Sequence, residues 1–243
     1  KEELADATIK LGFVNVIDAF HVVDNDEIPK RFYVDERKEN DGIRITDEFS
    51  KLSTGDQIAN LPEEVEARWR LVETAWELGI SRSVVSISYE PEDGILFAQS
   101  ESRRKNVTNS RDALNGYQKG RCFYCGQNIT LQEGESFPDV DHFFPNILKQ
   151  HGFGNIIDGV WNLVLACTEC NRGTKGKFAK LPTLKYLEYL SNRNEHLISS
   201  HHPLRETLIQ QTGKSAQQRL SFLNDFYNRA WSILIHRWDP FQP

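Results

Sequence analysis

The stretches "CFYCGQ" (residues 122–127) and "CTECNR" (residues 167–172) contain all four cysteines of this 243-residue chain. Each holds a Cys-x-x-Cys pair, and 41 residues separate the two pairs. Paired motifs of this kind place four thiolates at the corners of a tetrahedron, which is the geometry of a closed structural zinc site. We therefore predict one structural Zn²⁺ bound by Cys122, Cys125, Cys167 and Cys170. Two disulfides are the alternative, and a reducing cytoplasm disfavours them.

The segment between the cysteine pairs predicts two strands. "FPDVDHFFP" (137–145) is typical of a short strand bounded by prolines, and "WNLVLAC" (161–167) is a second apolar run of strand length. After the last cysteine, "NRGTKGKFAKLP" (171–182) predicts a short helix that ends before Pro182. The expected order is strand, strand, helix, with the zinc site holding the two strands together.

The first of these strands carries an adjacent acid and base, Asp141 and His142. Neighbouring residues on a regular strand point to opposite faces, so the two can serve one site only where the strand ends or bends. Pro145 is well placed to end it. The alternative is that the two side chains form a hydrogen-bonded structural couple without a catalytic role.

The motifs resemble a known family. In order and spacing, the chain resembles the HNH endonucleases of the His-Me finger (ββα-metal) class over about residues 119–180. The matching segments are Val140-Asp141-His142, Asn162-Leu163-Val164-Leu165 and Cys167-x-x-Cys170-Asn171-Arg172-Gly173-x-Lys175, bracketed by Cys122 and Cys125. The resemblance implies a ββα finger stapled by zinc and an activity that hydrolyses DNA.

The resemblance also implies a role for each matching residue. His142 would be the general base, Asp141 and Asn171 would hold a catalytic Mg²⁺ or Mn²⁺, and Asn162 would brace the loop that carries His142. The third motif residue is Asn171 instead of histidine, which favours a hard cation that prefers oxygen ligands.

These roles agree with the chemistry of phosphodiester hydrolysis. An imidazole can accept the proton of the attacking water, and an oxygen-bound cation can offset charge on the phosphate. Basic side chains after the last cysteine would contact the phosphate oxygens. The candidates are Arg172, Lys175 and Lys177.

Charge is distributed unevenly along the chain. The net charge is −6 overall, with −11 in residues 1–100 and +5 in residues 101–243. Basic residues flank the cysteine motifs on both sides, which indicates DNA as the partner, whereas solvated surface faces are the simpler alternative. The acidic first part is a candidate for docking a protein partner or for restraining DNA binding. This pattern suggests a restriction or antiphage defence component.

The flanking regions predict short strands and amphipathic helices. Strands are expected at 12–23, 31–35 and 42–46, and a hairpin at 84–99 that turns at Pro91 to Gly94. A helix over 61–79 places Val65, Trp69, Val72 and Trp76 on one apolar stripe. Near the C-terminus, Ser215 and Gln218 form a capping box before a helix with its own apolar stripe, which is expected to cover the finger or the N-terminal strands. That stripe is Leu220, Leu223, Tyr227, Trp231, Leu234 and Trp238.

The adjacent histidines 201 and 202 are interpreted as the approach to a helix that begins at Pro203 and ends at Gly213. A metal role for this pair is the alternative.

The sequence therefore predicts an α+β fold in which a ββα-metal finger is embedded in a body of short strands and amphipathic helices. The expected divisions are an N-terminal α+β region (1–118), the nuclease finger (119–180) and a C-terminal helical region (181–243). No apolar run approaches the roughly 20 residues of a bilayer span, and the first residues lack a secretory signal, so we expect a cytoplasmic location.

The preferred function is a divalent-metal-dependent DNA endonuclease. The alternative is a catalytically silent four-cysteine zinc module that binds nucleic acid or a partner protein.

Overall fold

The computed structural model describes residues 16–23, 25–40, 42–53, 61–77, 86–92, 94–99, 104–131 and 137–241. The chain forms two compact units, residues 1–59 and residues 60–243. The sequence suggested a domain boundary at residue 118, and the residues before and after this position belong to the same second unit. All the cysteines, and every residue that we considered for catalysis, belong to this second unit.

The first unit is built from short elements. In chain order they are α2 (Val16–Ala19), β1 (Val22–Val23), β2 (Asp26–Glu27), β3 (Tyr33–Glu36), α3 (Arg37–Asn40), β4 (Gly42–Ile45) and α4 (Asp47–Ser53). Two antiparallel ladders form, β1 with β2 and β3 with β4. Tyr33 is the buried anchor, because its ring packs against His21 at 4.3 Å and its hydroxyl donates to the Ile17 carbonyl at 2.7 Å.

The expected strands at 31–35 and 42–46 correspond to β3 and β4. The strand expected over 12–23 is wrong over 16–19, where the chain is the helix α2, and residues 12–15 lie outside the described residues.

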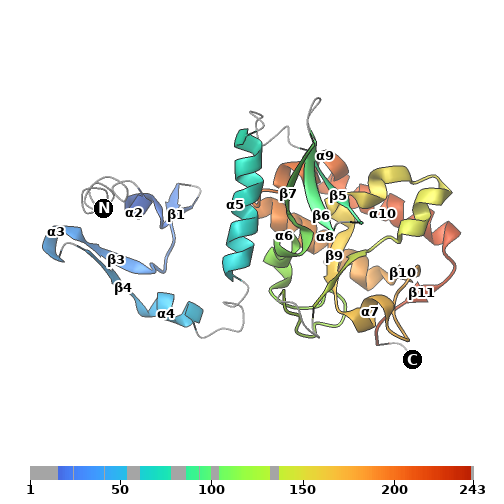
Figure 1. The fold of residues 1–243 in the computed structure, drawn as a ribbon, viewed down its shortest axis with the longest axis horizontal. Helices are drawn as coiled ribbons and strands as arrows, with labels where there is room; N and C mark the ends of the chain where they lie inside the picture. The colour runs from blue at the N-terminus through green and yellow to red at the C-terminus, as the bar shows by residue number, and fades with distance from the viewer. Residues whose placement is uncertain are drawn as a thin grey trace. The chain divides into compact units, whose positions relative to one another are not determined.

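A three-stranded antiparallel sheet follows the first helix of the second unit. Its strands are β5 (Ser86–Glu90), β6 (Ile95–Gln99) and β7 (Arg104–Asn109), in the order β5-β6-β7. The hairpin turns at residues 91–94 as the sequence predicted, and Gly94 has φ 65°, a left-handed conformation that glycine adopts without strain. Figure 1 shows α5 (Leu61–Glu77) on the β7 side of the sheet and α9 (Arg205–Thr212) on the β5 side.

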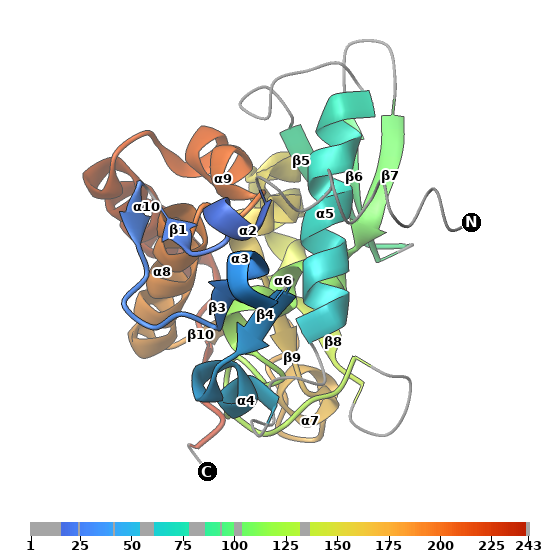
Figure 2. The ribbon, with the colours of Figure 1, turned by 90° about the vertical axis from the view of Figure 1, so that its left-hand side faces the viewer.

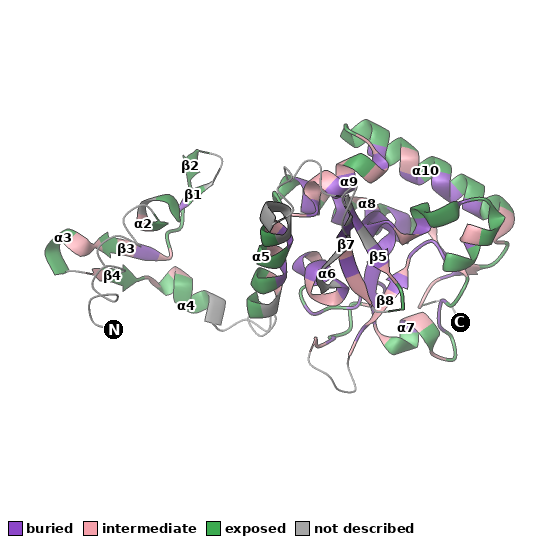
Figure 3. Ribbon diagram, turned by 45° about the horizontal axis from the view of Figure 1, so that its top comes forward, coloured by how far each residue is buried: buried purple, intermediate pink, exposed green. Residues whose placement is uncertain are grey.

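The helix α5 lies where the sequence predicted it, but its buried face is different. Val65 and Trp69 are 56% and 51% exposed, whereas Ala67 and Leu71 are buried. The side chain of Trp76 lies outside the described residues. Figure 2 shows α5 across the sheet, and Figure 3 shows its exposed outer face in green.

The cause is the close approach of α5 to α6 (Ser110–Gln118). A Cβ added at Gly116 of α6 would lie 2.9 Å from Glu64 Oε1 of α5. The side chains of Glu64 and Arg68 therefore fill the space beside Gly116, and Trp69 lies on the outer face of α5. Apolar spacing alone therefore selected the wrong stripe.

A strand, strand, helix sequence contains the candidate site. β8 (Asp139–His142) pairs antiparallel with β9 (Leu163–Ala166), from Asp139 opposite Ala166 to His142 opposite Leu163. Three 3₁₀ turns connect the strands: η3 (Asn146–His151), η4 (Gly154–Asp158) and η5 (Val160–Asn162). The helix α7 (Thr168–Arg172) follows β9. It begins before Asn171, where the sequence predicted its start, and ends at Arg172, so the predicted helix is wrong beyond that residue.

Helices complete the second unit. They are α8 (Leu184–Ser199), α9 and α10 (Ala216–Ile233), and a small parallel ladder joins β10 (Leu181–Pro182) to β11 (Arg237–Trp238). Ser215 and Gln218 form the predicted capping box at the start of α10. Pro203 precedes α9, which begins at Arg205 instead.

The predicted apolar stripe of α10 is only partly correct. Leu223 and Tyr227 are buried, but Leu220 and Trp231 are 45% and 49% exposed. The helix ends at Ile233, so Trp238 belongs to β11 instead. Phe226, which the stripe omitted, makes the main contact, with its ring 4.7 Å from Phe144 and 4.9 Å from Trp161.

The fold class is therefore mixed helix and small, mostly antiparallel sheets. Within the described part of the chain, no helix has both the length and the apolar composition needed to cross a bilayer.

Candidate functional site

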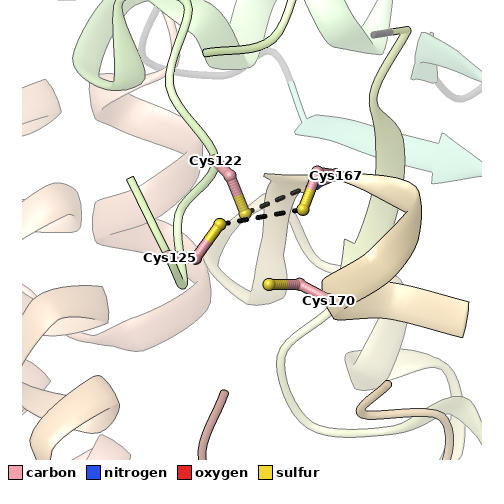
Figure 4. Close-up of side chains that lie close together, drawn as sticks. All are labelled: Cys122, Cys125, Cys167 and Cys170. Atoms are coloured by element: carbon pink, nitrogen blue, oxygen red, sulfur yellow. Dashed lines mark hydrogen bonds between the residues drawn. The ribbon is translucent and has the colours of Figure 1, made fainter. Parts of the chain in front are cut away.

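The four cysteine sulfurs converge on one point. All lie within 4.8 Å of one another, and Cys125 Sγ is 3.8 Å from Cys167 Sγ. A tetrahedral zinc with Zn–S bonds of about 2.3 Å requires S–S separations of about 3.8 Å. Figure 4 shows Cys122 and Cys125 reaching the cluster from the turn after α6, and Cys167 and Cys170 reaching it from the start of α7. The cluster can hold a metal ion and would join both sides of the β8–β9 hairpin.

The cysteines are free thiols, because their sulfurs are farther apart than the roughly 2.05 Å of a disulfide. A hydrogen bond from Cys170 lowers the pKa of Cys122 to about 5. Burial raises the pKa of Cys167 to about 11, and the bond to Cys122 raises the pKa of Cys170. The cluster therefore carries little negative charge by itself, and a dication would allow all four thiols to ionise.

His142 ends β8 and points toward an acidic partner. Its Nε2 lies 3.1 Å from Asp158 Oδ1, while Lys149 Nζ lies 2.6 Å from Asp158 Oδ2. The imidazole also packs against Tyr89, with 5.7 Å between ring centroids, and only 11% of its side chain is exposed. If Nε2 carries the proton donated to Asp158, Nδ1 keeps a lone pair that can accept another proton.

The Asp158 carboxylate is kept ionised by its two partners. Burial raises its pKa, but hydrogen bonds from His142 and Lys149 more than offset this, so its pKa is lowered overall. An ionised carboxylate fixes the orientation and tautomer of a histidine that bonds to it.

Asp141 lies on the opposite face of β8 and has different partners. Its side chain is buried, with Lys177 Nζ 3.1 Å from Oδ1 and the Tyr124 hydroxyl donating to Oδ2 at 2.6 Å. Burial raises the pKa of Asp141, and Lys177 and Tyr124 oppose this rise. Both carboxylate oxygens are thus already engaged within the protein.

Asn171 contacts another acid. Its Nδ2 donates to Asp139 Oδ2 at 3.1 Å, and Arg172 Nε donates to the same oxygen at 2.9 Å. Asp139 and Asp141 share one face of β8 because they are two residues apart. The structure therefore joins Asn171 to Asp139, a residue that the sequence interpretation missed, instead of to Asp141.

The three predicted phosphate ligands differ in exposure. The Arg172 side chain is 64% exposed, and Lys175 is also exposed. Lys177 is fully buried, and its Nζ donates to the His142 and Phe178 carbonyls in addition to pairing with Asp141. This burial argues against a phosphate contact by Lys177 and indicates that it supports the end of β8.

Asn162 contacts the chain on both sides of its loop. Its Oδ1 accepts from Phe144 N at 2.7 Å, and its Nδ2 donates to the carbonyls of Phe144 and Ile157 at 3.0 and 2.9 Å. From behind, the buried Arg193 of α8 donates to the carbonyls of Trp161 and Leu163 at 3.1 and 2.7 Å. The segment that follows His142 is therefore held by side chains from two other elements.

In addition to Asp139, sequence reasoning missed three residues around His142, namely Asp158, Lys149 and Tyr89. Asp158 follows His142 by 16 residues, and Tyr89 belongs to a different sheet. No local spacing rule relates them to His142, because the 3₁₀ turns of the connecting loop bring Asp158 back to β8. An isolated acid in the connection between the two strands was the only sequence signal.

Comparisons with known protein families, with curated proteins and with solved structures found no match for this chain.

Proposed function

We propose that this protein is an endonuclease that hydrolyses phosphodiester bonds in DNA, with His142 as the general base. The observation that carries the proposal is the His142–Asp158 pair at the end of β8, on the same strand pair that the four-cysteine cluster flanks. A histidine oriented by a carboxylate is a recurrent arrangement for removing a proton from a nucleophile. The motif resemblance to HNH endonucleases supports the same reaction.

In the proposed reaction, His142 Nδ1 accepts a proton from a water molecule. The water oxygen attacks phosphorus as the bond to the leaving oxygen breaks, and that oxygen takes a proton from solvent. Asp158 is a positioning residue, since it holds Nε2 of the ring. The exposed side chains of Arg172 and Lys175 are the proposed contacts for the phosphate backbone.

The four cysteines are proposed to bind a structural Zn²⁺. Their donor set fits, because four sulfurs within 4.8 Å of one another match a closed tetrahedral site. Zinc would lock the two chain segments that flank the β8–β9 hairpin and would take no part in the reaction itself.

The expected catalytic Mg²⁺ or Mn²⁺ fits less well. Asp141 offers no free carboxylate oxygen while Lys177 and Tyr124 occupy both, and the Asn171 amide is bonded to Asp139. We therefore assign no step of the reaction to a bound cation. Binding of such a cation by Asp141 would require that Lys177 or Tyr124 leave its carboxylate.

The ion pair between Lys177 and Asp141 favours the second candidate, which is a catalytically silent zinc module that binds nucleic acid or a partner protein. A carboxylate neutralised by a buried lysine is a common structural couple. In this case His142 and Asp158 would only brace the hairpin.

Nicking of supercoiled plasmid separates the two candidates. The protein is incubated with plasmid in Mg²⁺, in Mn²⁺ and in EDTA, and zinc content is measured on the same samples. We expect His142→Ala to abolish nicking while zinc remains at one per chain. His151→Ala is the matched control, because His151 is an exposed histidine of the same loop. Equal nicking by wild type and His142→Ala would indicate contamination and would favour the silent module.

A defence role is the biological setting that we propose for this activity. A nuclease with a strongly acidic N-terminal part binds bulk DNA weakly, so its cutting is restrained until recruitment. The N-terminal unit is then the proposed docking region for a protein partner.

A further inference from the structure

A cavity of about 650 Å³ lies beside His142. It is enclosed by the turn of the β5–β6 hairpin, by the loop between β8 and β9, and by one side chain of α9. Its lining includes Tyr89, Phe97, Asn146, Asn155, Trp161 and Gln211. The volume is within the roughly 300–1,000 Å³ of pockets that bind small organic groups.

Two residues relate the cavity to the proposed general base. Tyr89 and Asp158 both line the cavity, and each of them also contacts the His142 ring. A phosphate attacked next to His142 would therefore place an adjacent nucleotide at the mouth of the cavity.

The lining matches a nucleobase in two respects. The rings of Tyr89 and Phe97 can contact a flat aromatic group, and the amides of Asn146 and Asn155 can bond to its polar edge. The third amide, Gln211, has a buried oxygen that has no hydrogen-bond partner among the described residues. Its Nε2 donates to the Ile87 carbonyl at 3.2 Å, which fixes the amide orientation and leaves Oε1 as an unsatisfied acceptor. A base N–H group would satisfy it after a small movement of the Gln211 side chain, because Oε1 itself is buried.

The charges exclude a phosphate from the same space. Glu90, Glu92 and Asp158 line the cavity. Lys149 is the single basic side chain among the described residues of the lining, and it is already paired with Asp158. An anionic group would be repelled, whereas a neutral base would not. The sugar-phosphate chain must then stay outside, on the side of His142.

We propose that this cavity receives one nucleobase of the substrate strand, unstacked from its neighbours, while His142 acts on the adjacent phosphodiester bond. This inference rests on the proposed endonuclease function. Unstacking a paired base costs a few kcal/mol, so single-stranded or mismatched DNA should be cut faster than perfect duplex.

The test uses DNA that carries the fluorescent base 2-aminopurine at successive positions. His142→Ala binds this DNA without cutting it, and 2-aminopurine brightens when it is unstacked. We expect the emission to rise at one position next to the cleavage site that the wild-type protein defines. Gln211→Met removes the acceptor and should weaken binding at that position roughly five- to tenfold. Gln210→Met, an exposed neighbour on α9, is the matched control and should bind normally.

The outcomes distinguish this inference from the proposed function. The base pocket would be overturned, and the endonuclease left intact, if DNA were bound and cleaved while the emission stayed unchanged at every position. Equal effects of the Gln211→Met and Gln210→Met variants would have the same meaning. Failure both to bind and to cut DNA would overturn both. A rise in melting temperature with free adenosine or cytidine, without a change in emission from DNA, would assign the cavity to a free nucleoside and overturn the strand-bound form.

Discussion

At the scale of single residues, Asn162 shows how one amide group sets the shape of the loop after His142. It satisfies three backbone groups in a place from which water is excluded, since its own side chain is fully buried. An apolar residue of similar size would leave those groups without partners. Residues that make no contact with substrate can therefore decide whether the side chain of a general base is correctly placed.

We predict that Asn162→Leu lowers the free energy of unfolding by on the order of 3 kcal/mol or more, because three buried polar groups lose their partners. Urea unfolding followed by tryptophan fluorescence measures the change. Asn192→Leu, on the exposed face of α8, is the matched control and should change stability by less than about 0.5 kcal/mol. A loss below about 1 kcal/mol for Asn162→Leu would contradict the bracing role.

At the scale of residues, the sequence predicted those contacts that depend on the spacing of residues within a short motif. The two Cys-x-x-Cys pairs identified a cluster that can hold a metal, because a zinc ligand set is encoded in short motifs. Asp139 and Asp158 were missed, since their contacts with Asn171 and His142 depend on the path of the chain between the motifs. Lys177 was taken as a phosphate ligand because its burial under β8 is not encoded in the glycine-rich segment around it.

At the scale of elements, positions of helices were easier to predict than the faces that they bury. The limits of α5 and the capping box of α10 follow from local signals in the sequence. The buried faces do not, because Trp69 and Trp231 satisfy helical spacing and still lie on the exposed sides. Which stripe is buried depends on the shape of the neighbour, and for α5 that neighbour is α6, with Gly116 at the contact.

The junction of α8 and α9 contains a group that links stability to pH. His202 is buried there and accepts a hydrogen bond from Leu204 N through Nδ1. Burial, with smaller effects from Arg68, Arg193 and His196, lowers its pKa to about 3. The folded state therefore favours neutral His202, while the unfolded chain binds a proton near pH 6.5.

We predict that this contribution to stability is fully present above about pH 6.5 and is lost as the pH falls toward 3. At pH 4.5 the loss should be roughly 2 to 3 kcal/mol. His202→Asn removes the titrating ring and keeps an acceptor for Leu204, so its stability should depend less on pH. Denaturant unfolding between pH 7 and pH 4.5 measures the difference. His201→Asn, at the exposed neighbour, is the control, and equal pH slopes for the two variants would contradict the assignment.

The cysteine cluster connects the turn after α6 to the start of α7. We predict that Cys125→Ser loses the bound zinc and unfolds the second unit at 37 °C, because a structural metal site supplies folding free energy directly. Mass spectrometry under native conditions and a melting curve measure the two effects. Thr174→Ala, an exposed position near α7, is the control. A Cys125→Ser variant that keeps zinc and melts like wild type would refute the zinc assignment.

At the scale of the whole molecule, the two units differ in charge. Residues 1–59 carry a net charge of −6, whereas residues 60–243 carry as many basic as acidic residues. The excess negative charge of the chain thus belongs to the unit without the cysteines. Long-range repulsion of DNA would originate from this unit and would weaken as salt increases.

We predict that residues 60–243 bind a short DNA duplex more tightly than the full chain at low salt. The boundary follows the compact unit, because a cut at residue 101 would separate α5 and two strands from it. Fluorescence anisotropy at 50 and 200 mM salt measures both affinities, and circular dichroism checks that the shortened chain is folded. Equal affinities at both salt concentrations would remove the idea that the N-terminal unit restrains binding.

The hydrogen bonds from Arg193 to the loop that follows His142 have a consequence for the order in which the parts of this site form during translation. The chain leaves the ribosome from its N-terminus, so His142 and all four cysteines emerge before α8 does. Until the guanidinium of Arg193 reaches the carbonyls of Trp161 and Leu163, the loop lacks its rear support. A fragment that ends before Arg193 would contain His142 and the four cysteines and would still lack this support for the loop.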